Sequence, residues 1–400
     1  MPWKESRASD ERLKFVAGLL SGDSTMTDLC RHFGISRKTG YKWKKRHEVG
    51  GAAALIDLSR RPHSHPSSIP QSTRERIIEM RQQHPTWGAR KIRARLQRVD
   101  PTECWPAAST IHRAVAAAGL VRLARKRRTV PYVQPLIPAI RPNQVWCMDF
   151  KGSFECGNGE RCDTFTVTDA FSRFVLYCQA IDNLGHEEVD RICDALMKKY
   201  GVPERIRTDN GTPFSSISGL GISKLSVKWM RLGIVHERIE PGKPTQNGRH
   251  ERLHRTLKED TASPPALSIA EQCERFIAFQ HCFNEQGPHQ ALLMQTPFSV
   301  YRTSMRAFPN WLDEIRYDDR HIVRPVRKNG TIRWKGKEVF ITEVLRREQI
   351  GLLPTKAGAF QVYFGQLHLG VLDGETATFK PNRECLPDTH NRHAQNAVSG

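Results

Sequence analysis

Three acidic residues stand at positions where a carboxylate could bind a metal ion. Asp149 lies in the apolar segment 145–150, where a buried carboxylate is costly unless it meets a cation or another partner. Asp209 follows an expected strand at 206–208, and ligand sites of α/β sheets favour the carboxyl ends of strands. Glu251 lies in a basic segment with helical periodicity. Three such carboxylates would suit two Mg²⁺ ions that activate a water and stabilise the leaving oxygen of a phosphodiester.

Two of these carboxylates also have an ordinary structural explanation. The Asp-Asn-Gly sequence that begins at Asp209 is usually only a turn. Glu251 and Lys258 are seven residues apart, so they return to nearly the same helical face after two turns, which is typical of a surface ion pair. A functional interpretation therefore depends on the three carboxylates as a set.

The segments around these residues predict a sheet with helices. Segments 145–154, 164–169 and 174–181 are rich in β-branched and aromatic residues and predict an antiparallel meander. An amphipathic helix is expected at 186–200, and Gly-Val-Pro ends it before a short strand at 204–208. This order indicates an α/β core. Further helices are expected at 223–232, 245–258 and 268–284.

The C-terminal part of the chain returns to short strands. Glycine-containing turns separate five apolar segments, and together they predict a small β-barrel. The expected strands are 332–334, 338–341, 351–353, 360–364 and 367–372.

The N-terminal segment 10–47 predicts a helix-turn-helix. Two expected helices are followed by a Gly-Ile-Ser break, where glycine permits the turn and serine caps a basic third helix. The cations of that helix are the expected DNA contacts: Arg37, Lys38, Lys42, Lys44 and Lys45. The alternative is a helical hairpin with a solvated charged face, and Gly40 within the third helix favours it slightly because glycine weakens helices.

A second helical unit is expected between residues 73 and 120, with Arg90 and Lys91 as its candidate DNA contacts. Two such units in series would cover a longer DNA site than one. The alternative is a single DNA-binding unit followed by a structural helical bundle. A polar, basic linker precedes this unit, and the basic run 122–128 and a proline-rich connector follow it.

The charge distribution supports a polyanionic partner. The 400 residues carry a formal net charge of +20. Residues 1–130 hold 27 Lys or Arg and 11 Asp or Glu, whereas residues 131–310 hold 21 and 20. No apolar run approaches the roughly 20 residues of a membrane span, and no secretory signal is recognised, so a cytoplasmic protein is expected. The ten cysteines show no C-x-x-C pair, which predicts reduced thiols and no zinc site.

Four ordered motifs carry a family resemblance. They are W-C-M-D-F, V-T-D-A-F-S-R-F, R-T-D-N-G-T-P-F and P-T-Q-N-G-R-H-E-R-L-H-R-T-L-K. Together they resemble the integrase catalytic core of bacterial insertion-sequence transposases, over residues 140–305. The resemblance implies an RNase H-like fold in which Asp149, Asp209 and Glu251 are the catalytic, metal-binding D, D, E residues, with Mg²⁺ as cofactor and Mn²⁺ as the ion able to substitute. The 41 residues between Asp209 and Glu251 exceed the spacing common in the family, so an insertion is expected near 215–223.

The resemblance also assigns roles outside the three carboxylates. It implies that Lys258 contacts the DNA end and that Asp169 is not a metal ligand but either structural or a residue that supports the ligands. The segment 283–292 departs from the family pattern at Phe283 and Gly287, where Tyr and Arg are usual, and this leaves open a copy with reduced activity. No G-x-x-x-x-G-K-[ST] loop is present, so no nucleotide cofactor is expected.

These observations predict an α/β multidomain protein with N-terminal all-α helix-turn-helix units, a central RNase H-like core and a C-terminal small β-barrel. The expected boundaries are 1–50, a linker at 51–71, 72–130, a linker at 131–142, 143–305 and 315–385. The expected function is metal-dependent 3′ strand cleavage and strand transfer by a homo-oligomer on element-end and target DNA, with no membrane partner. A partner ATPase or host factor remains open. The alternatives are a domesticated DNA-binding regulator and a nuclease that cuts without joining.

Overall fold

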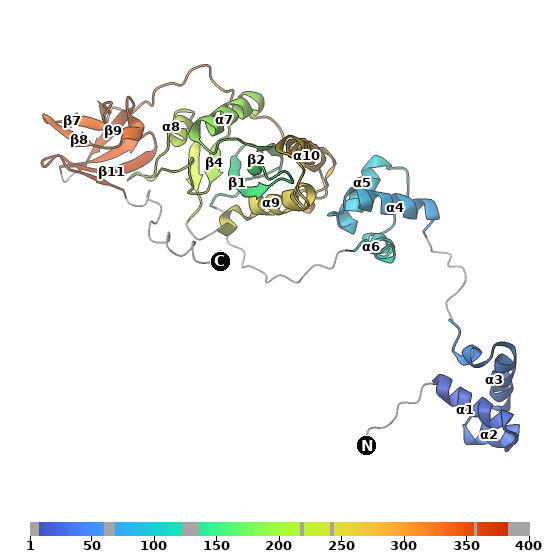
Figure 1. Cartoon of the computed structure of the whole chain (residues 1–400). Helices are drawn as coiled ribbons and strands as arrows, with labels where there is room; N and C mark the ends of the chain where they lie inside the picture. Colours follow the sequence, from blue (N-terminus) through green and yellow to red (C-terminus); the bar gives the residue numbers. More distant parts are fainter. Residues whose placement is uncertain are drawn as a thin grey trace. The chain divides into compact units, whose positions relative to one another are not determined.

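The computed structural model describes residues 8–59, 69–121, 136–216, 220–240, 244–355 and 358–382. The chain separates into two compact units, Met1–Ile69 and Pro70–Gly400, and each is described by itself (Figure 1). The basic run 122–128 and residues 131–135 of the connector expected at 131–142 lie outside the described residues.

The N-terminal unit is a helix-turn-helix fold. Its elements are α1 (Ala8–Leu20), α2 (Met26–His32), α3 (Arg37–Gly50) and the 3₁₀ turn η1 (Ala52–Leu55). The Ser36 hydroxyl accepts a hydrogen bond from the Thr39 N–H at 3.2 Å, so the predicted cap begins α3. Leu55 is only 1% exposed and belongs to the same apolar core as Phe15 and Trp43. The unit therefore continues past residue 50, where the sequence placed its end.

Close helix packing explains why a glycine occupies position 40 of α3, although glycine has a low helix propensity. A Cβ atom built on Gly40 would lie 2.7 Å from Cys30 Sγ, 2.9 Å from Met26 Sδ and 3.0 Å from Phe15 Cζ. Only a glycine lets α3 approach α1 and α2 this closely. Gly40 therefore does not favour the hairpin alternative, because this helix packing requires it.

We expect Gly40→Ala to destabilise the N-terminal unit, because the added methyl group overpacks its core. The expected cost is about 1–3 kcal/mol, larger than the roughly 1 kcal/mol that alanine gains in helix propensity. Thermal unfolding, followed by circular dichroism, measures it. Gly88→Ala is the matched control, since a Cβ there meets no atom within 4 Å. Equal melting curves for wild type and Gly40→Ala would contradict the packing argument.

The second helical segment contains α4 (Gln71–Gln83), α5 (Ala89–Val99) and α6 (Ala108–Ala117). Ile92 and Leu96 of α5 are four residues apart and both buried, as are Ile77 of α4 and Ile111 of α6. The apolar stripe of each helix thus faces the other two, and the basic side chains of α5 occupy its remaining surface.

A mixed five-stranded sheet in the order β3-β2-β1-β4-β5 forms the centre of the second unit. Strands β1 (Val145–Glu155), β2 (Arg161–Asp169) and β3 (Val175–Ala180) form the predicted antiparallel meander. Strand β4 (Arg205–Thr208) pairs parallel to β1, and β5 (Val235–Arg238) pairs parallel to β4. The sequence analysis missed β5, because Val-His-Glu-Arg is mostly polar.

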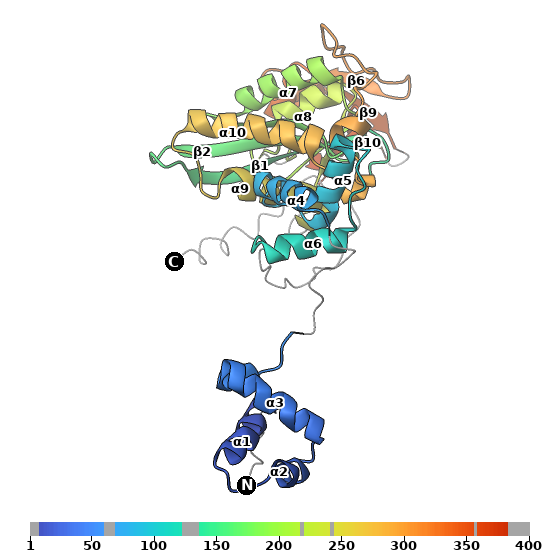
Figure 2. The same cartoon turned by 90° about the vertical axis from the view of Figure 1, so that its right-hand side faces the viewer.

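Helices cover both faces of this sheet (Figure 2). Trp146 and Met148 of β1 pack in one apolar cluster with residues of α7 (His186–Tyr200) and α8 (Lys224–Arg231). A second cluster joins β2 and β3 to α9 (Gly248–Thr261) and α10 (Ile269–His281). Because strand side chains alternate between faces, Cys147 and Asp149 of β1 face the α9 side, whereas Phe150 packs against the first cluster.

The helices that follow the sheet differ from the predicted ones in their ends. The helix expected at 245–258 is split into the 3₁₀ turn η2 (Pro244–Asn247) and α9. The helix expected at 268–284 ends at His281 and continues as the π turn η3 (Cys282–Gln286). The short elements η4 (Gln290–Leu292) and α11 (Pro297–Val300) complete this region.

The C-terminal region is antiparallel β structure. One sheet has the order β12-β11-β10-β9-β6, and β7 pairs with β8 in a separate hairpin. The five predicted strands are confirmed, and β6 and β12 are additional; closure into a barrel stays a prediction. The element bounds are β6 (Ile322–Pro325), β7 (Thr331–Trp334), β8 (Lys337–Phe340), η5 (Glu343–Leu345), β9 (Gln349–Pro354), β10 (Ala359–Phe364), β11 (Leu367–Asp373) and β12 (Phe379–Pro381).

The region where an insertion was expected connects the central and C-terminal parts. Leu220 and Ile222 are nearly fully buried, and they belong to the apolar core of the C-terminal sheet rather than to that of the central sheet. Residues 217–219 lie outside the described residues. No helix in the described part of the chain combines the length and apolar character of a membrane span.

Candidate active site

Asp149 lies on the central strand of the sheet. It follows the buried residues Val145 to Met148 and pairs across the β1–β2 ladder with Thr166. Its position in the alternation of β1 places its side chain on the face covered by α9. The Asp149 side chain is 22% exposed, so it is largely desolvated but can still be reached from solvent.

Asp209 directly follows β4, the strand that pairs parallel to β1. The Gly211 N–H donates a hydrogen bond to Asp209 Oδ1 at 3.1 Å. The Asn210 side chain donates to the backbone carbonyl of Ile239 at 2.7 Å, which ties the turn to the chain after β5. The Asp-Asn-Gly sequence is therefore a turn, and this turn sets the orientation of the carboxylate.

Glu251 comes from the first turn of α9 and is exposed. Leu253 and Leu257 are buried in the apolar cluster between α9 and the sheet, and they fix the rotation of the helix. Glu251 is thus presented at the edge of the packed face, from which its charge reaches Asp149.

The structure brings the three acidic residues of the sequence analysis into one electrostatic site. Burial, the negative charge of Asp209 and, more weakly, that of Glu251 raise the pKa of Asp149 to about 7. Burial also raises the pKa of Asp209, against the hydrogen bond from Gly211. Such a set of oxygen donors disfavours its own ionisation and would be stabilised by divalent cations, so the three residues fit Mg²⁺ or Mn²⁺.

Asp149→Asn tests the electrostatic strain, which is the cost in stability of ionising Asp149 in the folded, metal-free protein. The folded-state pKa of Asp149, about 7, exceeds the ordinary value of 3.8, so metal-free wild-type protein loses stability as the pH rises from about 4 through 7. The variant lacks this loss. We therefore expect its free energy of unfolding to exceed that of the wild type by about 1–3 kcal/mol at pH 8 without divalent ions. The gain should shrink towards pH 5.

Thermal unfolding at several pH values measures this difference. The exposed carboxylate Asp182 provides the control, and Asp182→Asn should give no pH-dependent gain. Mg²⁺ should stabilise wild type at pH 8 and stabilise Asp149→Asn much less. A variant that is less stable than metal-free wild type at pH 8 would contradict the predicted strain.

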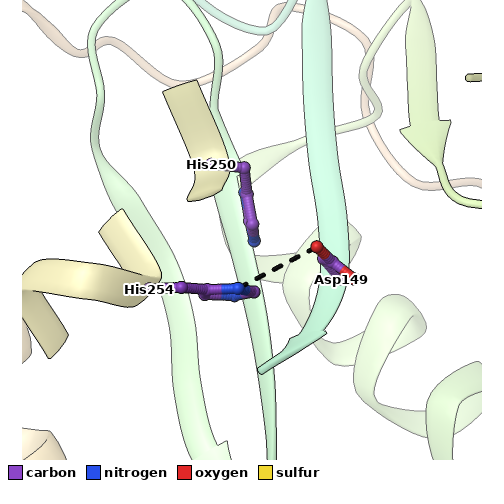
Figure 3. Close-up of side chains that lie close together, drawn as sticks. All are labelled: Asp149, His250 and His254. Atoms are coloured by element: carbon purple, nitrogen blue, oxygen red, sulfur yellow. Dashed lines mark ion pairs between the residues drawn. The ribbon is translucent and has the colours of Figure 1, made fainter. Parts of the chain in front are cut away.

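Two histidines beside the carboxylates were missed by the sequence analysis. His250 and His254 project from α9 towards Asp149 (Figure 3). Thr166 Oγ1 lies 2.7 Å from Nε2 of both rings and donates to the backbone carbonyl of Asp149 at 3.1 Å. Thr168 Oγ1 lies 2.9 Å from the other nitrogen of His250. Two histidines spaced four residues apart around Glu251 are the signal that could have predicted this cluster.

This network holds α9 against β1 and β2. Burial lowers the pKa of His254 to about 4 and lowers the pKa of His250 well below its ordinary value, so both rings are neutral near pH 7. Asp149, His250 and His254 place ring nitrogens and a carboxylate oxygen within 4.8 Å of one another. Hydrogen bonds to Thr166 and Thr168 engage three of the four ring nitrogens, and the fourth, Nδ1 of His254, lies 3.9 Å from Asp149 Oδ2. We therefore interpret the group as a positioning network for Asp149 and Glu251.

The predicted DNA contacts of α3 divide into two groups. Arg37, Lys38, Lys42 and Lys45 are exposed. Lys44 is half-buried and lies 3.8 Å from Glu48 in an ion pair along the helix. The first four residues therefore form the available cationic face of α3.

The two predicted contacts of α5 also differ. Arg90 is exposed, whereas burial lowers the pKa of Lys91, against the opposing influence of Asp260 in the central part of the chain. Arg98 of the same helix donates to the backbone carbonyl of Met294 at 2.9 Å. One side of α5 thus contacts the central region. Of the two predicted DNA contacts on this helix, Arg90 is therefore more accessible than Lys91.

The remaining site predictions concern Lys258, Asp169 and the segment after α10. Lys258 is exposed on α9. Asp169 is fully buried and accepts hydrogen bonds from Asn143 and Ser172, which agrees with a structural role. A Cβ on Gly287 would lie 3.2 Å from the carbonyl oxygen of Phe283, so the local backbone leaves little room for the larger residue usual in the family.

Family models match the N-terminal, central and C-terminal parts of the chain. Two models described as integrase core domain match residues 139–244 and 232–297. A model described as the IS481 family transposase, C-terminal domain matches residues 321–380. A helix-turn-helix domain matches 11–63, and a homeodomain-like domain matches 39–115. The chain is an insertion-element transposase with an integrase catalytic core.

Two curated relatives of the transposase also come from insertion elements. The insertion element IS476 uncharacterized 39.2 kDa protein of Xanthomonas euvesicatoria is 29% identical over 248 residues, which cover 60% of this chain and 68% of the relative. The insertion element IS407 uncharacterized 31.7 kDa protein of Burkholderia multivorans is 28% identical over 255 residues, 62% of this chain and 87% of the relative.

Solved structures similar to the transposase include two retroviral integrase cores. The HTLV-2 integrase catalytic core domain in complex with magnesium is 17% identical, with a TM-score of 0.32, over 41% of this chain and 99% of that one. The catalytic core domain of BIV integrase is 21% identical, with a TM-score of 0.30, over 40% of this chain and 93% of that one.

Proposed function

We propose that this transposase binds the ends of its insertion element and catalyses metal-dependent cleavage of the 3′ strand, followed by transfer of that strand into target DNA. The observation that carries this proposal is the meeting of Asp149, Asp209 and Glu251 from three separate elements of an integrase core. A scaffold protein has no need for two carboxylates whose charges raise the pKa of a third, which counts against the regulator alternative.

Each part of the proposed site has a distinct task. Asp149, Asp209 and Glu251 are the residues that would hold Mg²⁺, or Mn²⁺ in its place. When bound, such ions lower the pKa of a water and stabilise the departing oxyanion. The histidine and threonine network keeps α9, and with it Glu251, in register with β1. Lys258 contributes positive charge for the phosphates of the DNA end.

The two proposed steps are successive in-line displacements at phosphorus. In the first, the oxygen of a water forms a bond to phosphorus and the 3′ oxygen of the element strand leaves as a hydroxyl group. In the second, that 3′ hydroxyl attacks a target phosphodiester, and the 3′ oxygen of the target strand leaves. No covalent bond between protein and DNA is part of this route.

DNA recognition is assigned to the cationic face of α3, with the α4–α6 segment extending the contact. The net charge of +16 within residues 1–130 supplies a sequence-independent contribution to affinity. One subunit cannot easily hold two element ends, so we propose a homo-oligomer on DNA in the cytoplasm, where it meets the chromosome. The C-terminal β region, proposed as a small barrel, would bind flanking DNA, target DNA or a neighbouring subunit.

The proposal is tested with labelled duplexes that carry the element's terminal repeats. With Mg²⁺ at fixed salt, the transposase should nick the 3′ strand at the element end and leave a duplex of shuffled sequence intact. Specific binding without nicking would favour the regulator. Nicked product that never joins a target duplex would favour the nuclease.

A further inference from the structure

Lys151 lies on the same face of β1 as Asp149. The two residues are separated by one position, so the alternation of the strand places both side chains on the α9 side. The register of β1 against β2 shifts between Phe150 and Ser153, and Gly152 has a φ of +83°. Bulges of this kind redirect neighbouring side chains and often lie next to active sites.

A small pocket of about 60 Å³ lies against this bulge. Lys151 and Ser153 line it from β1, Thr164 from β2, and Leu257 and Lys258 from α9. Two lysines thus border one pocket, and one of them, Lys151, lies two positions from Asp149 on the same strand. Neither lysine forms an ion pair with a carboxylate within the ranges that the structure describes.

This arrangement suits one anion between two cations. The ammonium groups of Lys151 and Lys258 repel each other, and an anion held between them would replace that repulsion with two attractions. The anion must approach three carboxylates, so it needs positive charge at close range. A phosphodiester of a DNA strand meets these requirements, because lysine binds phosphate as a mobile point charge.

We propose that Lys151 binds, together with Lys258, one backbone phosphate of the DNA strand that enters the active site. The proposal rests on the proposed function for the identity of the anion. It adds to that function a residue of β1 that binds the strand together with a residue of α9. The competing explanation is that Lys151 only offsets the negative charge of Asp149.

Lysine footprinting tests the contact without relying on activity. The full-length transposase is acetylated with and without a pre-cleaved terminal-repeat duplex in Ca²⁺, and modified lysines are counted by mass spectrometry. We expect DNA to protect Lys151 and Lys258 several-fold and to leave the exposed α7 residue Lys199 unchanged. Protection of Lys258 without protection of Lys151 would overturn the proposal. Because the footprint reports binding alone, this result is distinct from a failure of the wild type to cleave or join DNA.

Substitution then separates binding from charge compensation. Lys151→Gln should raise the DNA concentration needed for half-maximal strand transfer about tenfold, and Lys151→Arg should restore most of it, because each phosphate contact contributes to binding. Lys199→Gln is the matched control and should behave as wild type. A Lys151→Gln variant with a shifted pH profile and an unchanged DNA requirement would overturn the proposal in favour of charge compensation.

Discussion

Asp209→Asn and Glu251→Gln should each reduce 3′ strand cleavage and strand transfer by roughly 10³-fold or more, because each removes a charged oxygen donor from the metal site. Asp209 lies at the end of β4 and Glu251 at the start of α9, and both act on the pKa of Asp149 on β1. The loss should appear in the rate at saturating DNA and Mg²⁺, measured by gel analysis of labelled element ends.

The control for Glu251 lies on the same helix. Glu259 is exposed on α9, eight residues further along, and Glu259→Gln should retain activity close to that of wild type. All variants should bind element ends as wild type does, since the proposed recognition surface lies in the N-terminal unit. Cleavage by Asp209→Asn or Glu251→Gln within tenfold of the wild-type rate would exclude these residues as metal ligands.

The second large effect concerns recognition of the element ends. Lys38→Ala combined with Lys42→Ala removes two exposed cations from α3, and we expect the affinity for terminal-repeat DNA to fall about 10- to 100-fold. The slope of log affinity against log salt should decrease by about 1 for each DNA phosphate that the variant no longer neutralises. Fluorescence anisotropy over a salt series measures both quantities.

Lys14 supplies the control within the same unit. It lies on α1 rather than on α3, and it pairs with Glu11 at 2.7 Å. Lys14→Ala should leave both affinity and salt slope almost unchanged. If the α3 double variant binds element ends as tightly as Lys14→Ala, then α3 is not the recognition helix.

The elements that carry the carboxylates could be predicted because their patterns are local. The apolar strand before Asp149, the short strand before Asp209 and the leucines of α9 each mark a buried face without reference to distant residues. Helix α7 was predicted with its observed bounds, since its apolar stripe and the following Gly-Val-Pro leave little ambiguity.

Other features depend on interactions between distant residues and have only a weak local signal. Strand β5 is polar because its side chains serve ion pairs with β4, where Glu237 pairs with Arg205 and Arg207. Gly40 is unfavourable for a helix by propensity alone, and only its close approach to Cys30 explains why glycine stands there. The histidines of α9 resemble basic surface residues in the sequence, and only the position of Thr166 on β2 shows that they are buried.

Strand transfer from a pre-cleaved element end tests the central claim most directly. Wild-type transposase is incubated with Mg²⁺, a labelled terminal-repeat duplex that ends in a free 3′ hydroxyl, and unlabelled target DNA. The account predicts joined product from wild type and none from Asp209→Asn or Glu251→Gln. Tight and specific binding of the element end by wild type, with neither cleavage nor joining in Mg²⁺ or Mn²⁺, would contradict it.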